Sequence, residues 1–340
     1  MAQQESAWAL SANPVSISYV PKDSAMEAGL SYLIHQAALP ASDQPDQTQT
    51  YRAYVSGNRK LGLLWLAGGI DWSQSLLEGR KWNLLSQPDY LITAGDSLGE
   101  PQRIEKYRIY GQAAYVLSPK IKVGIDGDYT ATSNEDRSSY HIYHGMAHLI
   151  RISGGVVYEQ VRRRFGASIH YTHRTEELTY DTDSKINFIH FLWGIGFRCK
   201  NYREVSCFAA KGTLGVSLQT ETLKEHWSLF HDLFYETQQL ADNPNNSGNL
   251  RGWEERLHQI SYQGRFTRTN KSWTHIWSPT ARFNQTTANR ILQRNPTTSS
   301  SAIWTTFATY RLARQRMLST QLSYEATKND TSAKRYPHGK

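Results

Sequence analysis

The chain has 340 residues, of which 39% are hydrophobic, and it carries a net charge of +8. Its mean hydropathy is -0.60, and no apolar run approaches the roughly 18 residues of a membrane helix, so on that test alone the chain looks soluble. The basic residues are scattered and accompany no nucleic-acid-binding motif, so we expect no nucleic acid as a partner.

Candidate strands follow one another along most of the chain, with hardly any helix between them. Many exceed the usual strand length of about five or six residues, and several reach the roughly 9–11 residues with which a tilted strand crosses a bilayer. The predicted strands are 14–20, 26–36, 49–58, 61–73, 105–117, 120–132, 142–158, 163–179, 185–200, 203–221, 223–236, 253–268, 272–288, 301–315 and 316–329.

The stretch "PKIKVGIDGDYTAT" at 119–132 shows the pattern that most of these strands share. Every second residue is apolar or aromatic, and charged or polar residues lie between them. Because alternate side chains of a strand point to opposite faces, such a strand is apolar on one face and polar on the other. The same alternation returns in the strands at 163–179, 185–200 and 253–268.

The connections between the predicted strands come in two sizes. Short turns such as "SGNRK" and "LSPK" alternate with long polar loops at 74–104, 133–141 and 237–252. Outer-membrane barrels show this asymmetry between their two ends. We find no domain boundary and therefore expect one domain over 1–340, with a disordered tail at 331–340.

Two arrangements would bury the apolar faces. A soluble sandwich stacks two sheets with these faces inward, whereas a barrel in lipid turns them outward and lines a wet interior with the polar faces. Strand length, charges within the strands and strand glycines favour the membrane arrangement. The predicted fold class is therefore all-β: an antiparallel, up-and-down transmembrane β-barrel of about 14 strands.

The barrel prediction assigns a direction to individual side chains and a partner to the terminal strands. Closure requires the strand at 14–20 or 26–36 to lie antiparallel beside 316–327. The side chains expected to point outward are Ile121, Val123, Ile125, Phe165, Ile169, Phe191, Trp193 and Ile195. Those expected to point inward include Lys122, Asp126, Ser168, His170 and Arg198.

The segment 82–132 resembles part of a family of bacteroidete-type outer-membrane β-barrel proteins of unknown function. The residues that carry the resemblance are Pro88, Tyr90, Ala94, Asp96, Gly99, Glu105, Tyr107, Gly111 and Tyr115. The resemblance covers about half of the chain and lends no catalytic residue. It implies a location in the outer membrane. The start "MAQQESAWALSANP" shows no signal peptide, which we expect to have been removed or lost to a gene start placed too late.

The sequence offers little for catalysis or cofactor binding. His141, His144 and His148 are too few and too spread over both strand faces for a structural zinc site. His170 and His173, followed by two glutamates, form a base-and-carboxylate set only if strand geometry brings them together. There is no Walker loop, dinucleotide fingerprint or nucleophile elbow. We therefore expect no enzymatic activity, no cofactor and no metal.

The predicted function is that of a non-catalytic outer-membrane barrel, either a passive or gated transport pore or a component of an envelope assembly. Its expected partners are outer-membrane lipid and envelope proteins. The alternative is a soluble all-β glycan-binding module or a carbohydrate-active enzyme. The residues predicted to line the pore are Lys122, Asp126, Asp128, Arg164, His170, Arg174, Arg198 and Lys211.

Overall fold

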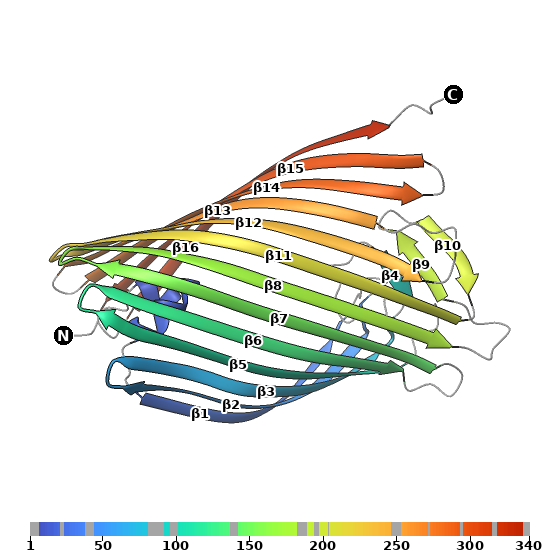
Figure 1. Ribbon diagram of the computed structural model, residues 1–340, viewed down its shortest axis with the longest axis horizontal. Coiled ribbons are helices and arrows are strands. Elements are labelled where there is room, and N and C mark those ends of the chain that lie inside the picture. Colours follow the sequence, from blue (N-terminus) through green and yellow to red (C-terminus); the bar gives the residue numbers. More distant parts are fainter. Residues whose placement is uncertain are drawn as a thin grey trace.

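Long antiparallel strands make up nearly all of the structure (Figure 1). The strands are β1 (Ser24–Gln36), β2 (Gln47–Leu61), β3 (Leu64–Glu78), β4 (Ile92–Gly95), β5 (Gln102–Ser118), β6 (Ile121–Asp136), β7 (Ile142–Glu159), β8 (Arg163–Asp181), β9 (Ile189–Trp193), β10 (Phe197–Tyr202), β11 (Glu204–Leu223), β12 (Trp227–Asn245), β13 (Trp253–Asn270), β14 (Trp273–Leu292), β15 (Asn295–Arg314) and β16 (Leu318–Arg335).

The computed structural model describes the residues 7–20, 24–37, 44–80, 92–95, 101–136, 142–181, 189–193, 197–202, 204–245, 253–270, 273–292, 295–314 and 318–335. In β4, β9, β10 and β16 it covers the backbone alone. The predicted directions of Phe191, Trp193, Ile195 and Arg198 therefore lie outside the described side chains.

Thirteen of these strands form one up-and-down sheet in the order β1-β2-β3-β5-β6-β7-β8-β11-β12-β13-β14-β15-β16. Each strand pairs antiparallel with its neighbours; Tyr107, for example, lies opposite Ala131 of β6. β4, β9 and β10 form a separate three-stranded sheet. The predicted strand at 185–200 is thus a hairpin beside the main sheet, and β4 lies within the predicted loop 74–104.

The main sheet is not closed, which corrects the predicted pairing of the terminal strands. Within the described residues, β1 pairs with β2 and β16 with β15, and no ladder joins β1 to β16. The predicted strand at 14–20 is instead a 3-10 helix, η2 (Pro14–Tyr19). The side chain of Asn13 accepts a hydrogen bond from the backbone N–H of Val15, and Pro14 occupies the first turn, so the chain coils at this point.

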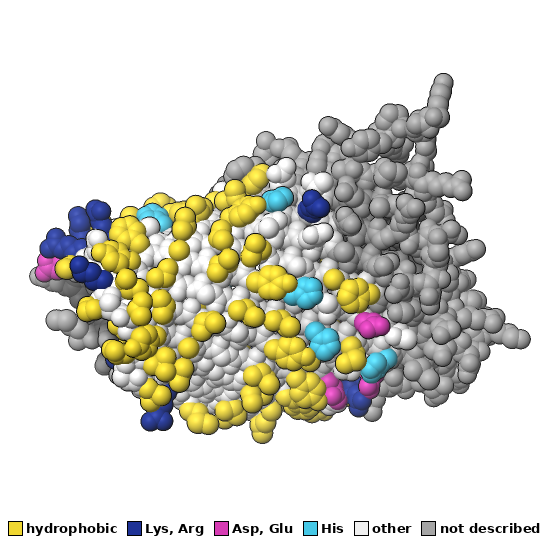
Figure 2. Space-filling view, viewed as in Figure 1, with side chains coloured by type: hydrophobic (Ala, Val, Ile, Leu, Met, Phe, Trp, Pro, Cys, Tyr) yellow, Lys and Arg dark blue, Asp and Glu magenta, His cyan; other side chains and the backbone are white. Residues whose placement is uncertain are grey.

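The outward face of the sheet is apolar, as the alternation predicts. Ile125 is 58% exposed and Ile169 53%, whereas Asp128 is 7% exposed and lies on the opposite face of the same strand as Ile125. Figure 2 shows hydrophobic side chains spread across the outer face, with several basic residues at the end on the left of the view and others near the opposite side. Further exposed apolar side chains come from other strands: Met26, Ile70, Ile109, Ile152, Leu218, Leu233, Ile260 and Trp277.

The N-terminal segment 7–20 occupies the inner side of the sheet, and we call it the N-terminal plug. It consists of η1 (Ala7–Leu10) and η2, and the side chains of Trp8 and Val15 are fully buried. The Trp8 ring packs against Phe230 of β12, with 5.5 Å between ring centroids. Figure 1 shows the plug at the end of the sheet where the short turns lie. The described residues thus include a buried apolar cluster that joins the plug to the wall of the sheet.

Three inward-facing glycines make room for the plug. A Cβ atom on Gly155 would lie 2.3 Å from Asn13 Oδ1, one on Gly166 would lie 2.4 Å from the Trp8 ring, and one on Gly124 would lie 2.7 Å from the backbone nitrogen of Val15. These distances are too short for any side chain. The plug consequently needs glycine at these positions of β6, β7 and β8.

The glycine contacts generate a prediction with a neighbouring control. Gly155→Val will displace the plug, whereas Gly154→Val will not, because a Cβ on Gly154 meets nothing within 4 Å. In a chain carrying Val15→Cys and lacking Cys199 and Cys207, Gly155→Val should raise the maleimide labelling rate about tenfold or more, which corresponds to ~1.4 kcal/mol of opening free energy. Equal labelling rates for the two variants would show that the plug is not seated there.

Candidate functional site

The residues predicted to line a pore lie on the inner face of the sheet wherever their side chains are described. Asp128 and Arg174 are buried, and Lys122, Asp126, Arg164, His170 and Lys211 are half-buried. Lys211 is in the same phase of β11 as Ser217 and Gln219, which are buried against the plug. The side chain of Arg198 lies outside the described residues. The predicted set does not form one site but falls into separate groups along the inner face.

The first group is an ion-pair cluster that holds the plug to the wall. The Tyr19 hydroxyl donates to Glu159 Oε1 at 2.7 Å, and Lys122 Nζ donates to the same oxygen at 3.2 Å. Arg164 Nη1 donates to Glu221 Oε2 at 2.8 Å, and Arg164 Nε lies 3.4 Å from Glu159. We call these five residues, Tyr19, Lys122, Glu159, Arg164 and Glu221, the plug latch.

The aromatic ring of Tyr19 takes part in the latch as well as its hydroxyl group. Lys122 Nζ lies 4.3 Å from the centre of this ring and Arg164 Cζ lies 4.9 Å from it. Both cations therefore make cation–π contacts with the Tyr19 ring. Burial, together with the neighbouring Glu159 carboxylate, raises the pKa of the Tyr19 hydroxyl. The hydroxyl therefore stays protonated and remains a donor to Glu159.

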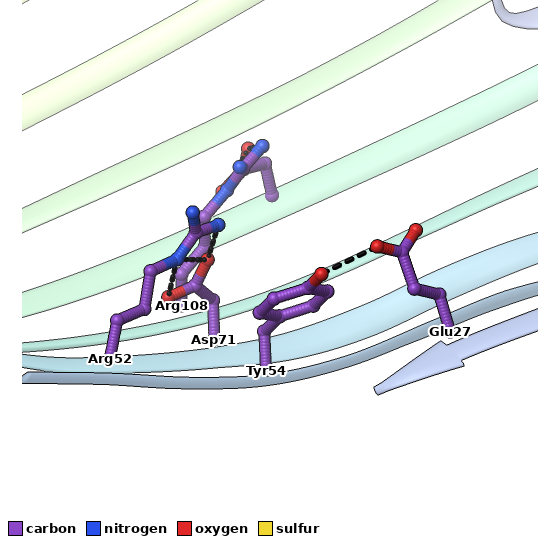
Figure 3. Close-up of polar contacts among 6 residues, drawn as sticks. Glu27, Arg52, Tyr54, Asp71 and Arg108 are labelled. Atoms are coloured by element: carbon purple, nitrogen blue, oxygen red, sulfur yellow. Dashed lines mark hydrogen bonds and ion pairs between the residues drawn. The ribbon is translucent and has the colours of Figure 1, made fainter. Parts of the chain in front are cut away.

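The second group is a belt of arginine and aspartate across β2, β3, β5, β6 and β7. Arg52 makes a bidentate ion pair with Asp71, and Tyr54 donates to Glu27 of the edge strand β1 (Figure 3). We call this belt, Glu27, Arg52, Tyr54, Asp71, Arg108, Asp128 and Arg151, the Arg–Asp belt.

Asp128 is the most buried charge of the belt, and it accepts hydrogen bonds from one arginine and faces a second. Arg108 Nε donates to its two carboxylate oxygens at 3.1 and 2.9 Å, and Arg151 Nη2 lies 3.6 Å away. Asp71 and Arg108 are directly opposite each other in the register of β3 and β5. Carboxylates and guanidinium groups therefore alternate along the belt, so that each partly buried charge has a partner of opposite sign.

The third group is a hydrogen-bond network around Asn13, which lies between η1 and η2 of the plug. Asn13 Nδ2 donates to the carbonyl oxygen of Ala167 and to Gln219 Oε1, both at 3.2 Å. Gln219 Nε2 donates to Ser217 Oγ at 2.6 Å and to Asp232 Oδ1 at 3.3 Å. The plug is thus connected to β8, β11 and β12 by hydrogen bonds as well as by packing.

His170 belongs to this third group and not to a catalytic set with His173. Its Nε2 lies 2.8 Å from Ser168 Oγ, and its ring packs edge-on against Phe234. His173 is on the opposite face of β8 and stacks on Tyr171. The strand geometry therefore separates the two histidines that the sequence placed in one candidate site.

The candidate metal ligands are also separated. His148 Nδ1 lies 2.9 Å from the hydroxyl of Tyr129 on the outer face, and His144 Nδ1 lies 3.7 Å from Glu135. His141 lies outside the described residues. Across the described ranges, no three His, Cys, Asp or Glu side chains come together as a metal site would require.

Of the helices that the structure describes, none is long and apolar enough to span a membrane.

Sequence reasoning missed several members of the three groups. Arg52 and Arg108 are in the inward phase of their strands, which the alternation at 49–58 and 105–117 could have shown. The roles of Tyr19 and Asn13 could not be found in this way, because the segment that carries them was predicted as a strand. The partners of each charge depend on the register between strands, which a single strand pattern does not specify.

The chain is an all-β protein whose main sheet is antiparallel and up-and-down. This sheet is apolar on its outer face and polar on its inner face, which is the opposite of the arrangement in a soluble β-sandwich. The chain belongs to DUF6850, a family of unknown function, whose model matches residues 14–339. No curated protein matches the chain.

Among solved structures, the chain is similar to the toluene transporter TbuX of Ralstonia pickettii, with 14% identity, a TM-score of 0.39 and coverage of 96% of this chain and 93% of that chain. It is similar to the toluene transporter TodX of P. putida, with 13% identity, a TM-score of 0.36 and coverage of 97% and 94%. It is also similar to the ferric yersiniabactin uptake receptor FyuA of Yersinia pestis, with 6% identity, a TM-score of 0.43 and coverage of 87% and 57%. At such low identities and TM-scores, the chemistry of this chain has to follow from its own residues.

The plug latch predicts a large cost for removing one of its charges. Arg164→Met leaves the Glu221 carboxylate, whose side chain is 1% exposed, without its ion-pair partner. The free energy of unfolding should fall by about 3–5 kcal/mol. Adding Glu221→Gln should restore much of it, because the buried charge is then gone. Denaturant titration of the purified protein measures both effects.

Arg52→Met is the matched control for this measurement. Arg52 forms an ion pair with Asp71, but its side chain is 48% exposed, so its loss should cost about 1 kcal/mol or less. An Arg164→Met cost no larger than that of Arg52→Met would contradict the assignment of Arg164 to a buried latch.

Proposed function

We propose that the chain is an integral outer-membrane β-barrel protein that acts as a gated, non-catalytic channel for small solutes. The observation that carries this proposal is the inversion of the sheet faces. Large apolar side chains such as Ile125 and Ile169 are exposed on the outside, while ion pairs occupy the inside. Lipid stabilises an apolar outer face, whereas water does not.

The soluble alternative is disfavoured by the same observation. A glycan-binding sandwich or a β-scaffold enzyme would pack its apolar strand faces together. In the described residues, a buried apolar cluster joins the plug to the inner wall, whereas the large apolar side chains of the outer face are exposed, with no second layer over them. The bacteroidete type of the outer-membrane family, suggested by the segment 82–132, is part of the proposal.

The N-terminal plug supports a gated channel and not an open one. It is held by a latch of ion pairs, by hydrogen bonds from Asn13 and by the packing of Trp8 on Phe230. In outer-membrane barrels the short turns face the periplasm. On that basis the plug closes the periplasmic end, and its displacement opens the path.

The proposed path is lined by the polar face of the strands. Charges of both signs along it would set which ions and solutes pass. The proposed lining residues are Lys122, Asp126, Asp128, Arg164, His170, Arg174, Arg198 and Lys211.

The two unpaired edges of the sheet favour a second function, as the membrane part of an envelope assembly. Edge strands present rows of N–H and C=O groups that lipid cannot satisfy. In the structure as described, β1 and β16 each have one such edge. A strand of an envelope partner could form hydrogen bonds with these backbone groups, so that none of them would face lipid without a partner. Photo-crosslinking from Ser31 of β1 in intact cells tests this: a crosslinked envelope protein would support it, and labelling of lipid alone would speak against it.

The outward direction of Ile125 predicts a penalty that depends on the membrane. Ile125→Arg should lower the free energy of unfolding from lipid bilayers by about 2–4 kcal/mol, because the guanidinium group would face acyl chains near the bilayer midplane. Ile125→Leu keeps the face apolar and serves as the control, with a cost below about 1.5 kcal/mol. A cost for Ile125→Arg as small as that of the control would place this side chain in water.

The plug predicts the conductance of the reconstituted protein. In planar bilayers the wild type should show little current, and Gly155→Val should raise it because the plug is displaced. Gly154→Val should behave as the wild type does. In the Gly155→Val background, Lys211→Gln should shift the selectivity toward cations. If Gly155→Val folds in bilayers but carries no current, the barrel is a structural component and not a channel.

A further inference from the structure

A cavity of about 520 Å³ lies between the N-terminal plug and the inner face of β12, β13, β14 and β15. Ala12 of the plug forms one side, and Asp232, Gln263 and Arg282 are among the wall residues. Its volume is in the range of sites that bind small molecules, roughly 300–1,000 Å³. None of the residues predicted from the sequence to line a pore contributes to it.

The wall of this cavity combines many hydrogen-bonding groups with the aromatic ring of Phe234. Gln263 and Asn284 supply amides, neighbouring serine and threonine residues supply hydroxyl groups, and Phe234 supplies the ring. An amide or hydroxyl side chain can both donate and accept a hydrogen bond, as each hydroxyl group of a sugar does. Asp232 and Arg282 contribute one charge of each sign, so the wall selects neither an anion nor a cation.

One polar atom of the wall lacks a partner. Asn284 Oδ1 is buried and accepts no hydrogen bond from any residue that the structure describes. Buried polar atoms normally have a partner, and an unsatisfied one costs about 1–3 kcal/mol. Asn284 also lines the cavity, so a rotation of its amide group would turn Oδ1 toward a donor there, such as a sugar hydroxyl.

The cavity is also connected to the plug by hydrogen bonds. Asp232 accepts from Gln219 at 3.3 Å, and Gln219 accepts from Asn13 of the plug at 3.2 Å. A molecule that binds to Asp232 therefore acts on the same network that holds the tip of the plug. Occupancy of the cavity and seating of the plug are linked through one side chain, Gln219.

We propose that this cavity binds a neutral, polyhydroxylated solute the size of a mono- or disaccharide. The inference deepens the proposed channel function and rests on it for its biological meaning, since the bound sugar would be the transported solute. An apolar solute would not match a wall that carries the amide groups of Gln263 and Asn284 and the hydroxyl group of Ser261. A zwitterion would use Asp232 and Arg282 but leave Gln263 and Asn284 unused.

Calorimetric titration of the purified protein in detergent tests the site, with maltose and glucose as probes and glycine and inorganic phosphate for comparison. We expect a sugar to bind, and Asn284→Leu and Gln263→Leu each to weaken its binding about tenfold, the effect of one lost hydrogen bond. Gln238→Leu is the matched control. Gln238 is in the same inward phase of β12 as Asp232 and Phe234 but does not line the cavity, so its affinity should stay within about twofold of the wild type.

Three results would overturn the inference: no binding of either sugar, tighter binding of glycine or phosphate than of sugar, or an equal loss of affinity in Gln238→Leu. Because binding is measured in detergent, it does not depend on current through a bilayer. Sugar binding by the wild type, with no current through Gly155→Val in bilayers, would uphold the site and reject the channel. Conductance without sugar binding would uphold the channel and reject the site.

Discussion

The structure depends on one constraint: an extended chain points alternate side chains to opposite faces, and a single-layer sheet cannot hide both. In this protein the apolar residues take the outer face and the charged residues the inner face. A shift of one residue in any strand would reverse this division and place charges such as Lys122 and Asp126 outside. The outward face needs an apolar surrounding, and the inward face needs partners for its charges.

The inner face meets that need in three ways. The Arg–Asp belt pairs its charges across neighbouring strands, the plug latch pairs four charges around Tyr19, and a hydrogen-bond network connects Asn13 through Gln219 to Asp232. The plug brings a large apolar side chain, Trp8, into this polar interior, where it joins a buried cluster with Val157 and Phe230 of the wall. The glycines of β6, β7 and β8 accept it by omitting side chains. Closure of the interior and stability of the wall are therefore linked.

The alternation predicted much of the fold because a period of two residues is a local property. The strands at 105–117, 120–132, 142–158 and 163–179 correspond to β5, β6, β7 and β8, and Ile125 and Asp128 face as expected. The prediction of a strand at 14–20 was wrong. The segment forms a 3-10 helix, because the cap at Asn13 and the ring of Pro14 outweigh its apolar spacing. Closure, the partners of Asp128 and the cavity beside Ala12 depend on contacts between distant residues, which a strand pattern does not contain.

The orientation of the two faces can be measured directly along β6. Single cysteines at Ile125, Asp126, Gly127, Asp128 and Tyr129, labelled with an environment-sensitive dye in lipid vesicles, would be exposed to a quencher fixed on acyl chains and to one dissolved in water. We predict that the acyl-chain quencher acts at 125, 127 and 129 and the aqueous quencher at 126 and 128. Uniform quenching by the aqueous reagent, or the reverse alternation, would contradict a sheet with its apolar face in lipid.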